Sequence, residues 1–243
     1  MQELEKTGLF LVIDGNDGSG KATQVNLLAA ALEERGIGVL KIDFPRYHTN
    51  IMGRLIGESL SGKHSEFATL DPHITSVLYA ADRFESRAEI EAALKEDKVV
   101  IADRYASSNQ IHQGGKIEDK EERKMFLRWL EELEHGLFGI PRPDRIVYLK
   151  VPVEASLKLL EEKRSVKNTN LSEGEKDQVE QDRNYLEQSH DTALWLSEHQ
   201  ANWTVIDCLD EEGSLRTRES VHDEILGIVD TFLDAQKGAS EIL

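Results

Sequence analysis

The sequence predicts an α/β fold, a three-layer sandwich in which helices cover both faces of a mainly parallel, five-stranded sheet. Short, continuously apolar runs such as residues 9–13 and 99–102 are typical of strands buried on both faces of a parallel sheet. Stretches with apolar residues at helical spacing separate these runs, as in residues 20–36, where Gly36 closes the expected helix. This alternation of strands and helices predicts parallel strands joined by helical crossovers.

The expected elements follow one another without an internal repeat or a linker. Strands are predicted at residues 9–13, 39–44, 99–102, 146–151 and 203–206. Helices are predicted at about residues 20–36, 71–94, 119–137, 153–163 and 215–233. Residues 164–176 are polar and lack periodicity, so this stretch is predicted to be a mobile loop.

Length, charge and cysteine content limit the possible functions. The 243 residues fit one domain spanning 1–243. A formal charge of −17 argues against binding nucleic-acid polymers, whereas a mononucleotide needs only a local positive pocket. Neither a signal sequence nor a membrane-spanning run is expected. The single cysteine, Cys208, fits a reducing cytoplasm.

A glycine-rich turn follows the first apolar run and carries a lysine. The turn reads Gly15-Asn16-Asp17-Gly18-Ser19-Gly20-Lys21-Ala22 and is followed by Thr23, which is the P-loop pattern except at its last position. Its N–H groups and the next helix N-terminus would bind the phosphates of ATP, with Lys21 between the β- and γ-phosphates. Ala22 replaces the usual Ser or Thr that offers a hydroxyl to Mg²⁺. A turn that only connects strand and helix is the alternative, but it does not account for the lysine.

Further segments of the chain resemble thymidylate kinases. They are Phe44-Pro45-Arg46-Tyr47, Leu78-Tyr79-Ala80-Ala81-Asp82-Arg83, Asp103-Arg104-Tyr105-Ala106-Ser107-Ser108-Asn109-Gln110, Pro143-Asp144 and Asp177-Gln178-Val179-Glu180-Gln181-Asp182. The similarity runs in register from about Leu9 to Ile206, and the order of the pieces makes it specific. It implies a P-loop nucleoside-monophosphate kinase fold with a mobile lid, and phosphorylation of dTMP to dTDP with ATP and Mg²⁺.

The resemblance also implies an acceptor site for dTMP. Asp17 would bind the sugar 3′-hydroxyl, and Tyr79 would stack on thymine. Arg46 and Arg83 would approach the phosphate and the base. The remaining implied contacts come from Phe44, Tyr47, Arg104, Ser108 and Asn109. Structural roles stay open as alternatives: a loop-bracing aspartate, arginines in surface salt bridges, and a tyrosine in the core. Many relatives carry Tyr where this chain has His112, so the resemblance does not settle the contacts to the 2′ side of the sugar.

Two charged residues, Asp103 and Arg104, follow the strand predicted at residues 99–102. The strand delivers them to the carboxyl edge of the sheet, where parallel α/β folds bind ligands. The resemblance implies that Asp103 holds Mg²⁺ through water and that Arg104 neutralises charge on the transferring phosphoryl group. An ion pair at the strand end is the alternative for Arg104.

The resemblance implies a second catalytic arginine, either in the P-loop or in the lid. Gly18 leaves the P-loop without one, so it is expected in the lid, at about residues 163–177. Arg164 is the best candidate, with Lys163 and Lys167 as helpers, because closure would bring positive charge to the γ-phosphate. The alternative is that these residues only balance the acidic run that follows.

Two other functions stay open at this stage. A deoxynucleoside kinase would need a carboxylate base just after the first strand, and Asp14 is conceivable, although Arg46 and Arg83 favour an acceptor that already carries phosphate. A nucleotide-binding protein without turnover is the other possibility, and Ala22 is its only hint.

The resemblance to thymidylate kinases also implies that the protein forms a homodimer.

Overall fold

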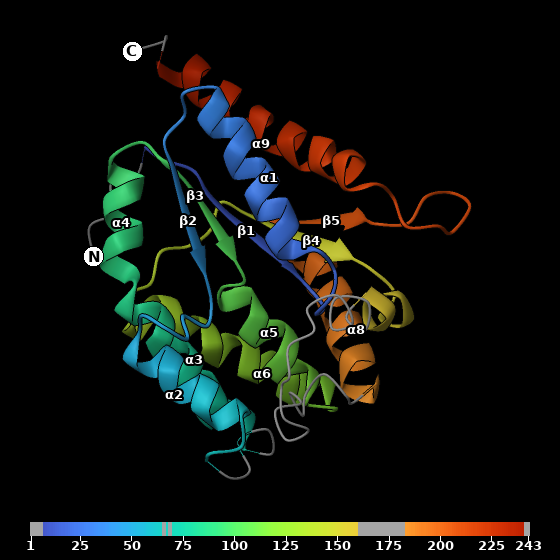
Figure 1. Ribbon diagram of the computed structural model, residues 1–243. Coiled ribbons are helices and arrows are strands. Elements are labelled where there is room, and N and C mark those ends of the chain that lie inside the picture. The colour runs from blue at the N-terminus through green and yellow to red at the C-terminus, as the bar shows by residue number, and fades with distance from the viewer. Residues whose placement is uncertain (1–6, 65–66, 68–69, 160–182, 241–243) are drawn as a thin grey trace.

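The computed structural model describes residues 7–64, 67, 70–159 and 183–240 (Figure 1). Its centre is a five-stranded sheet with the strand order β2-β3-β1-β4-β5, in which every neighbouring pair is parallel. The strands are β1 (Phe10–Gly15), β2 (Val39–Asp43), β3 (Val99–Asp103), β4 (Arg145–Lys150) and β5 (Trp203–Asp207). The structure therefore confirms the predicted three-layer α/β fold.

Helices cover both faces of this sheet. They are α1 (Lys21–Glu34), α2 (Ile51–Leu60), α3 (Pro72–Glu85), α4 (Arg87–Lys95), α5 (Ala106–Gly115), α6 (Lys120–Glu131), the π-helix η2 (Glu132–Leu137), α8 (Arg183–His199) and α9 (Arg218–Ser240). Figure 1 shows α1 and α9 together on one side of the sheet and α5, α6 and α8 on the other. Residues 153–159 are also helical. No helix in the described part of the chain is long and apolar enough to cross a membrane.

The central strand β1 shows why the sheet is buried on both faces. All six of its residues are buried. Phe10 and Val12 pack into the core under α4, α5, α6 and α8, whereas Leu11 and Ile13 pack into the core under α1 and α9. Because successive side chains of a strand point to opposite faces, a continuous apolar run serves both cores.

Several helices differ from the sequence prediction. The helices α2, α5 and α8 are additional, and the stretch predicted at 71–94 divides at Ser86 into α3 and α4. The stretch predicted at 119–137 ends in the π-helix η2. The last helix begins at Arg218 rather than Leu215, because Leu215 pairs with Leu209 in an isolated β-bridge.

The strand register brings three aspartates to one edge of the sheet. Asp43 at the end of β2 pairs with Asp103 at the end of β3, and Asp103 pairs with Ile13, the neighbour of Asp14 in β1. In a parallel sheet the carboxyl ends of all strands lie at the same edge, which is where such folds bind ligands. The glycine-rich turn and Arg104 begin at this same edge.

Candidate active site

The glycine-rich turn connects β1 to α1 through backbone conformations that favour glycine. Gly15, Gly18 and Gly20 have φ angles of 152°, 83° and 92°, in the left-handed half of conformational space. Helix α1 begins at Lys21 and has no side-chain cap. The first N–H groups of a helix lack partners within it, and together with the helix dipole they form an anion site.

Lys21 points its ammonium group back over the turn. Its Nζ donates to the carbonyl oxygens of Gly15 and Asn16, each at 2.9 Å, and lies 3.7 Å from Asp17 Oδ1. Burial lowers the pKa of Lys21, and the charge of Arg104 adds to this. The side-chain amide of Asn16 and the hydroxyl of Ser19 are buried and have no hydrogen-bond partner in the described part of the chain. The turn thus holds buried charge and donors that fit a bound phosphate chain.

Asp14, the last side chain of β1 before the turn, is fully buried. Its Oδ1 accepts from Gly15 N at 2.9 Å. Its Oδ2 accepts from the hydroxyls of Ser107 (2.6 Å) and Ser108 (2.8 Å) at the start of α5. Three donors therefore hold this carboxylate between the turn and α5. Ser108, one of the implied acceptor contacts, donates a hydrogen bond from its hydroxyl to Asp14.

Arg104 stands at the centre of the charged groups. Its backbone lies in the left-handed region, with φ of 66°. Its guanidinium pairs with Asp17, contacts His112 Nε2 at 2.8 Å through Nη1, and lies 3.7 Å from Asp14 Oδ1. Burial disfavours its charge, but the neighbouring carboxylates outweigh burial and raise the pKa of Arg104. The group stays protonated and is aimed at the turn.

The two remaining carboxylates differ in their surroundings. Burial opposes ionisation of Asp17, but the charges of Arg104 and Lys21 outweigh it and hold the pKa of Asp17 well below its usual range. Burial raises the pKa of Asp103, and Lys21 opposes this. Within the described residues, the Asp103 carboxylate accepts no hydrogen bond and forms no ion pair, so its oxygens are available to a ligand.

A cavity of about 240 Å³ opens beside these groups. Asp17 and Arg104 form one end, and aromatic side chains form much of the remaining wall. The aromatic residues include Phe44, Tyr47, Phe67, Tyr79, Tyr105 and Tyr185. Tyr79 lies edge-on to Phe67, with ring centroids 6.1 Å apart. A flat ring fits such a wall, and a phosphate fits the charged end.

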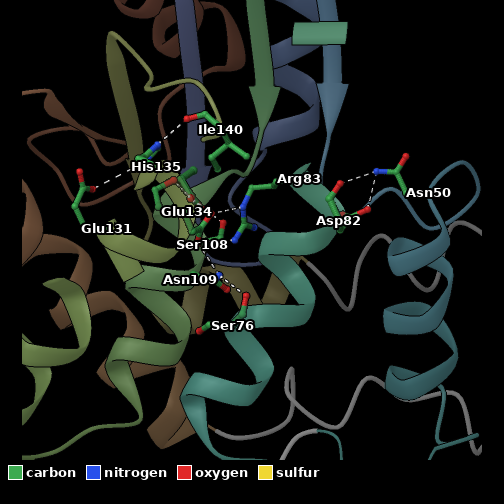
Figure 2. A network of polar contacts seen from close by, with 12 residues as sticks. Asn50, Ser76, Asp82, Arg83, Ser108, Asn109, Glu131, Glu134, His135 and Ile140 are labelled. Carbon is green, nitrogen blue, oxygen red and sulfur yellow. Dashed lines mark hydrogen bonds and ion pairs between the residues drawn. The ribbon is translucent and has the colours of Figure 1, made fainter. Parts of the chain in front are cut away.

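Arg83 and Asn109 both line this cavity. Both hydrogen-bond to the carboxylate of Glu134, as Figure 2 shows. Arg83 Nε and Nη2 donate to the two carboxylate oxygens of Glu134, each at 2.7 Å. Asn109 Nδ2 donates to Glu134 Oε1 at 2.8 Å and to Ser76 O at 3.2 Å. The third guanidinium nitrogen of Arg83, Nη1, makes no hydrogen bond within the described residues. Glu134 thereby fixes Arg83 in the cavity wall.

Arg46 lies differently from the other predicted acceptor residues. Its guanidinium pairs with Glu89 and donates to Ser86 Oγ at 3.2 Å, and Arg46 is not among the residues that line the cavity. Its backbone N–H donates to Asp82 Oδ2 at 3.0 Å. Asp82 also accepts from Asn50 Nδ2 at 2.9 Å (Figure 2). In this conformation Arg46 belongs to a polar network with Asp82, Ser86 and Glu89 and does not line the cavity.

His112 is brought into the site by α5. Its ring stacks on Tyr185 with centroids 5.9 Å apart, and its Nδ1 is buried and has no hydrogen-bond partner within the described residues. Burial, followed by the charge of Arg104, lowers the pKa of His112 to about 4. A neutral imidazole can accept the hydrogen bond from Arg104 through Nε2 and keep a proton on Nδ1.

Ala22 and Thr23 lie in the first turn of α1. Arg164, its helpers and the rest of the expected lid lie outside the described residues. In the described ranges, no three His, Cys, Asp or Glu side chains converge on a metal position. The sequence interpretation missed Glu134, Ser107 and Tyr185. Only Ser107 carried a signal, because it belongs to the segment from Asp103 to Gln110 that resembles thymidylate kinases.

Comparison with known proteins agrees with this geometry. A family model described as thymidylate kinase matches residues 13–219. The chain belongs to the thymidylate kinase family. The thymidylate kinase of Mycobacterium tuberculosis is 31% identical over 146 residues, which cover 60% of this chain and 67% of that protein. The thymidylate kinase of Thermosipho melanesiensis is 28% identical over 232 residues, covering 93% of this chain and 100% of that protein.

The fold is also that of a solved thymidylate kinase structure. The Candida albicans enzyme superposes with a TM-score of 0.69 at 22% sequence identity, covering 93% of each chain. The resemblance inferred from the motifs is therefore confirmed at the level of family and fold. The family residues assigned to the thymidylate kinase acceptor site, except Arg46, line the cavity described above.

Proposed function

We propose that this thymidylate kinase family member transfers the γ-phosphoryl group of ATP to the phosphate of dTMP, as a single kinase domain. The observation that carries the proposal is the position of Arg104. It lies between the glycine-rich turn, which fits a phosphate chain, and an aromatic cavity with arginine in its wall. A donor and an acceptor phosphate held on the two sides of Arg104 are brought together for direct transfer.

The donor side of the reaction is held by the turn. The N–H groups at the start of α1 bind the phosphates, and Lys21 supplies a buried positive charge. Arg104 supplies a second charge to the oxygens that gain charge during transfer. Fixed cations in a site that excludes water stabilise this charge more than water does, so no covalent intermediate is needed.

The acceptor side is held by the cavity. Arg83 offers Nη1, which makes no hydrogen bond to the described residues, to the phosphate or base of dTMP, and Glu134 keeps the guanidinium in place. Tyr79 and Phe44 enclose the base, while Asp17 accepts from the sugar hydroxyl. Tyr47, Ser108 and Asn109 complete the acceptor wall. Because Arg46 pairs with Glu89 outside the cavity, its proposed phosphate contact requires it to leave that pair.

The residues present also fit Mg²⁺ bound together with ATP. The Asp103 carboxylate, at the sheet edge, accepts no hydrogen bond from the described residues, and Mg²⁺ needs only one or two carboxylates besides phosphate oxygens and water. When bound, Mg²⁺ neutralises the β- and γ-phosphate oxygens. Ala22 offers it no hydroxyl, so Asp103 is the main protein anchor, through water.

The proposal also covers the oligomeric state of the enzyme, the role of its lid and its location in the cell. Exposed apolar side chains on α2, α3 and η2, namely Ile51, Ile74, Phe84 and Leu137, suit the interface of a homodimer. Arg164, in the lid at about residues 163–177, supplies the second catalytic arginine. The enzyme acts in the cytoplasm on ATP and dTMP, without binding a nucleic-acid polymer or a membrane.

Comparison of dTMP with thymidine tests this proposal. With ATP and Mg²⁺ in excess, ADP release should depend on dTMP, and the product should be dTDP. Release with thymidine alone would assign a deoxynucleoside kinase, for which Asp14 would have to act as base despite its three hydrogen-bond donors. Binding of both nucleotides without dTDP would assign a protein without turnover.

A further inference from the structure

A second cavity lies on the α5, α6 and α8 side of the sheet, away from the glycine-rich turn. Its volume is about 630 Å³, within the range of small-molecule sites. Its wall includes Gln110 on α5, Arg128 on α6, His135 on η2 and Trp195 on α8. None of the described residues assigned to phosphoryl transfer lines it.

The charge of this wall differs from that of the whole protein. Three cations, Lys124, Arg128 and Arg142, line the cavity with one carboxylate, Glu131, in a chain whose formal charge is −17. Arg142 pairs with Glu131. Among the described residues, no carboxylate lies within ion-pair distance of the Arg128 guanidinium, whose Nε only reaches Lys124 O at 3.4 Å. A cation without a counter-ion beside a cavity favours an anionic ligand.

The wall also offers an aromatic surface and an acceptor. The rings of Trp195 and His199 stack with centroids 4.2 Å apart and planes at 22°. Gln110 Oε1 is buried and has no hydrogen-bond partner among the residues that the structure describes. A planar ring can pack against the stacked pair, and an N–H or O–H group of the same ligand can satisfy the amide oxygen.

Two elements connect this cavity to the proposed kinase site. The π-helix η2 directs Glu134 to Arg83 on one side and places His135 in the second cavity (Figure 2). Ser107 lines the second cavity and donates to Asp14 at 2.6 Å. A ligand here would contact the same short elements that hold the acceptor wall.

We propose that this cavity is a second ligand site, which takes a small planar aromatic anion carrying an N–H or O–H donor. The acid group pairs with Arg128, the ring packs on Trp195 and His199, and the donor reaches Gln110 Oε1. The site is distinct from the kinase site, and its existence does not depend on the proposed function.

The probe 8-anilinonaphthalene-1-sulfonate tests this site, because it combines fused and single aromatic rings, a sulfonate and an N–H donor. It is titrated by fluorescence into the full chain, with dTMP and a non-hydrolysable ATP analogue present at saturation. We expect saturable binding that survives both nucleotides. Arg128→Gln should weaken it about tenfold or more, and Arg128→Lys should restore part of the loss.

Lys120→Gln is the matched control, since it removes one charge from an exposed residue of the same helix outside the cavity. It should bind the probe as the wild type does. Arg128 is exposed, so the Gln variant should fold, which circular dichroism verifies. Complete displacement of the probe by the nucleotides, or equal affinity in Arg128→Gln and wild type, would overturn the proposal. Neither readout requires turnover, so the result for this second site can be distinguished from a failure of the kinase proposal.

Discussion

The guanidinium of Arg83 and the carboxylate of Glu134 form a two-bond ion pair inside the protein, although 51 positions separate them in the chain. Both side chains are only 2% exposed. Asn109 binds the same carboxylate, so one residue of η2 orients two residues of the proposed acceptor cavity. The acceptor wall therefore depends on a glutamate that does not itself line the cavity.

Replacing Glu134 by Gln should destabilise the fold and weaken dTMP binding. The change leaves the Arg83 charge buried without a counter-ion, which typically costs about 3–5 kcal/mol, with Gln near the lower end because it keeps one acceptor oxygen. Urea unfolding measures the loss, and KM for dTMP should rise while that for ATP stays nearly constant. Glu132→Gln, at an exposed position of the same helix, is the control and should change neither. Unfolding of Glu134→Gln at the wild-type midpoint would show that the pair contributes nothing.

Replacing Arg104 by Lys should lower turnover far more than ATP affinity. Lysine keeps one charge but lacks the planar fork that reaches Asp17 and His112 together. Loss of one such arginine typically costs about a thousandfold or more in kcat. Steady-state kinetics gives kcat, and calorimetry gives the Kd for ATP. A variant that turns over at nearly the wild-type rate would refute a catalytic role for Arg104.

His112→Gln should flatten the pH dependence of stability. The pKa of His112 is about 4 in the folded protein, below its ordinary value of 6.5. Between these values the unfolded chain binds a proton that the folded chain excludes, so stability is fully present above pH 6.5 and lost as pH falls toward 4. The variant should lose roughly 1–3 kcal/mol less than wild type between pH 7 and 4. Parallel stability curves in urea would contradict the burial of a neutral imidazole.

Ala22→Ser should lower the Mg²⁺ concentration that gives half-maximal rate. The serine hydroxyl would provide a direct oxygen ligand at the start of α1, in place of a water molecule. Affinity for dTMP should change little, because the acceptor cavity does not include position 22. A Mg²⁺ titration at fixed ATP measures the effect. An unchanged titration would mean that position 22 only packs in the first turn of α1.

The strands and the phosphate turn were predictable because their signals are local. Continuous apolar runs marked β1, β3 and β4, and the spacing of Gly15 and Lys21 marked the turn. The helices α2, α5 and α8 were not assigned. The helix α5, for example, carries polar residues that face Asp14 and Glu134 rather than a regular apolar stripe. When the residues of a helix contact a site, polar side chains replace part of the regular apolar stripe from which a helix is predicted.

The partners of the site residues were not predictable, because they come from distant parts of the chain. Arg83 and Arg104 were recognised from their motifs, but nothing local marks Glu134 as the partner of Arg83. The pair of Arg46 with Glu89 is likewise a tertiary contact between the end of β2 and α4. Motifs indicate the residues that we propose to contact the substrate, whereas the residues that orient them are set by the packing of helices.

The most direct test of the account is kcat/KM for ATP-dependent phosphorylation across a panel of nucleoside monophosphates. The panel comprises dTMP, dUMP, dCMP, dAMP and dGMP, each with Mg²⁺ and ATP in excess and with the diphosphate product identified. The account predicts formation of dTDP, with a higher kcat/KM for dTMP than for either purine nucleotide, because Arg83 and Tyr79 line a largely aromatic cavity with a volume of only about 240 Å³. Preference for a purine monophosphate, or binding of dTMP without any dTDP, would contradict it.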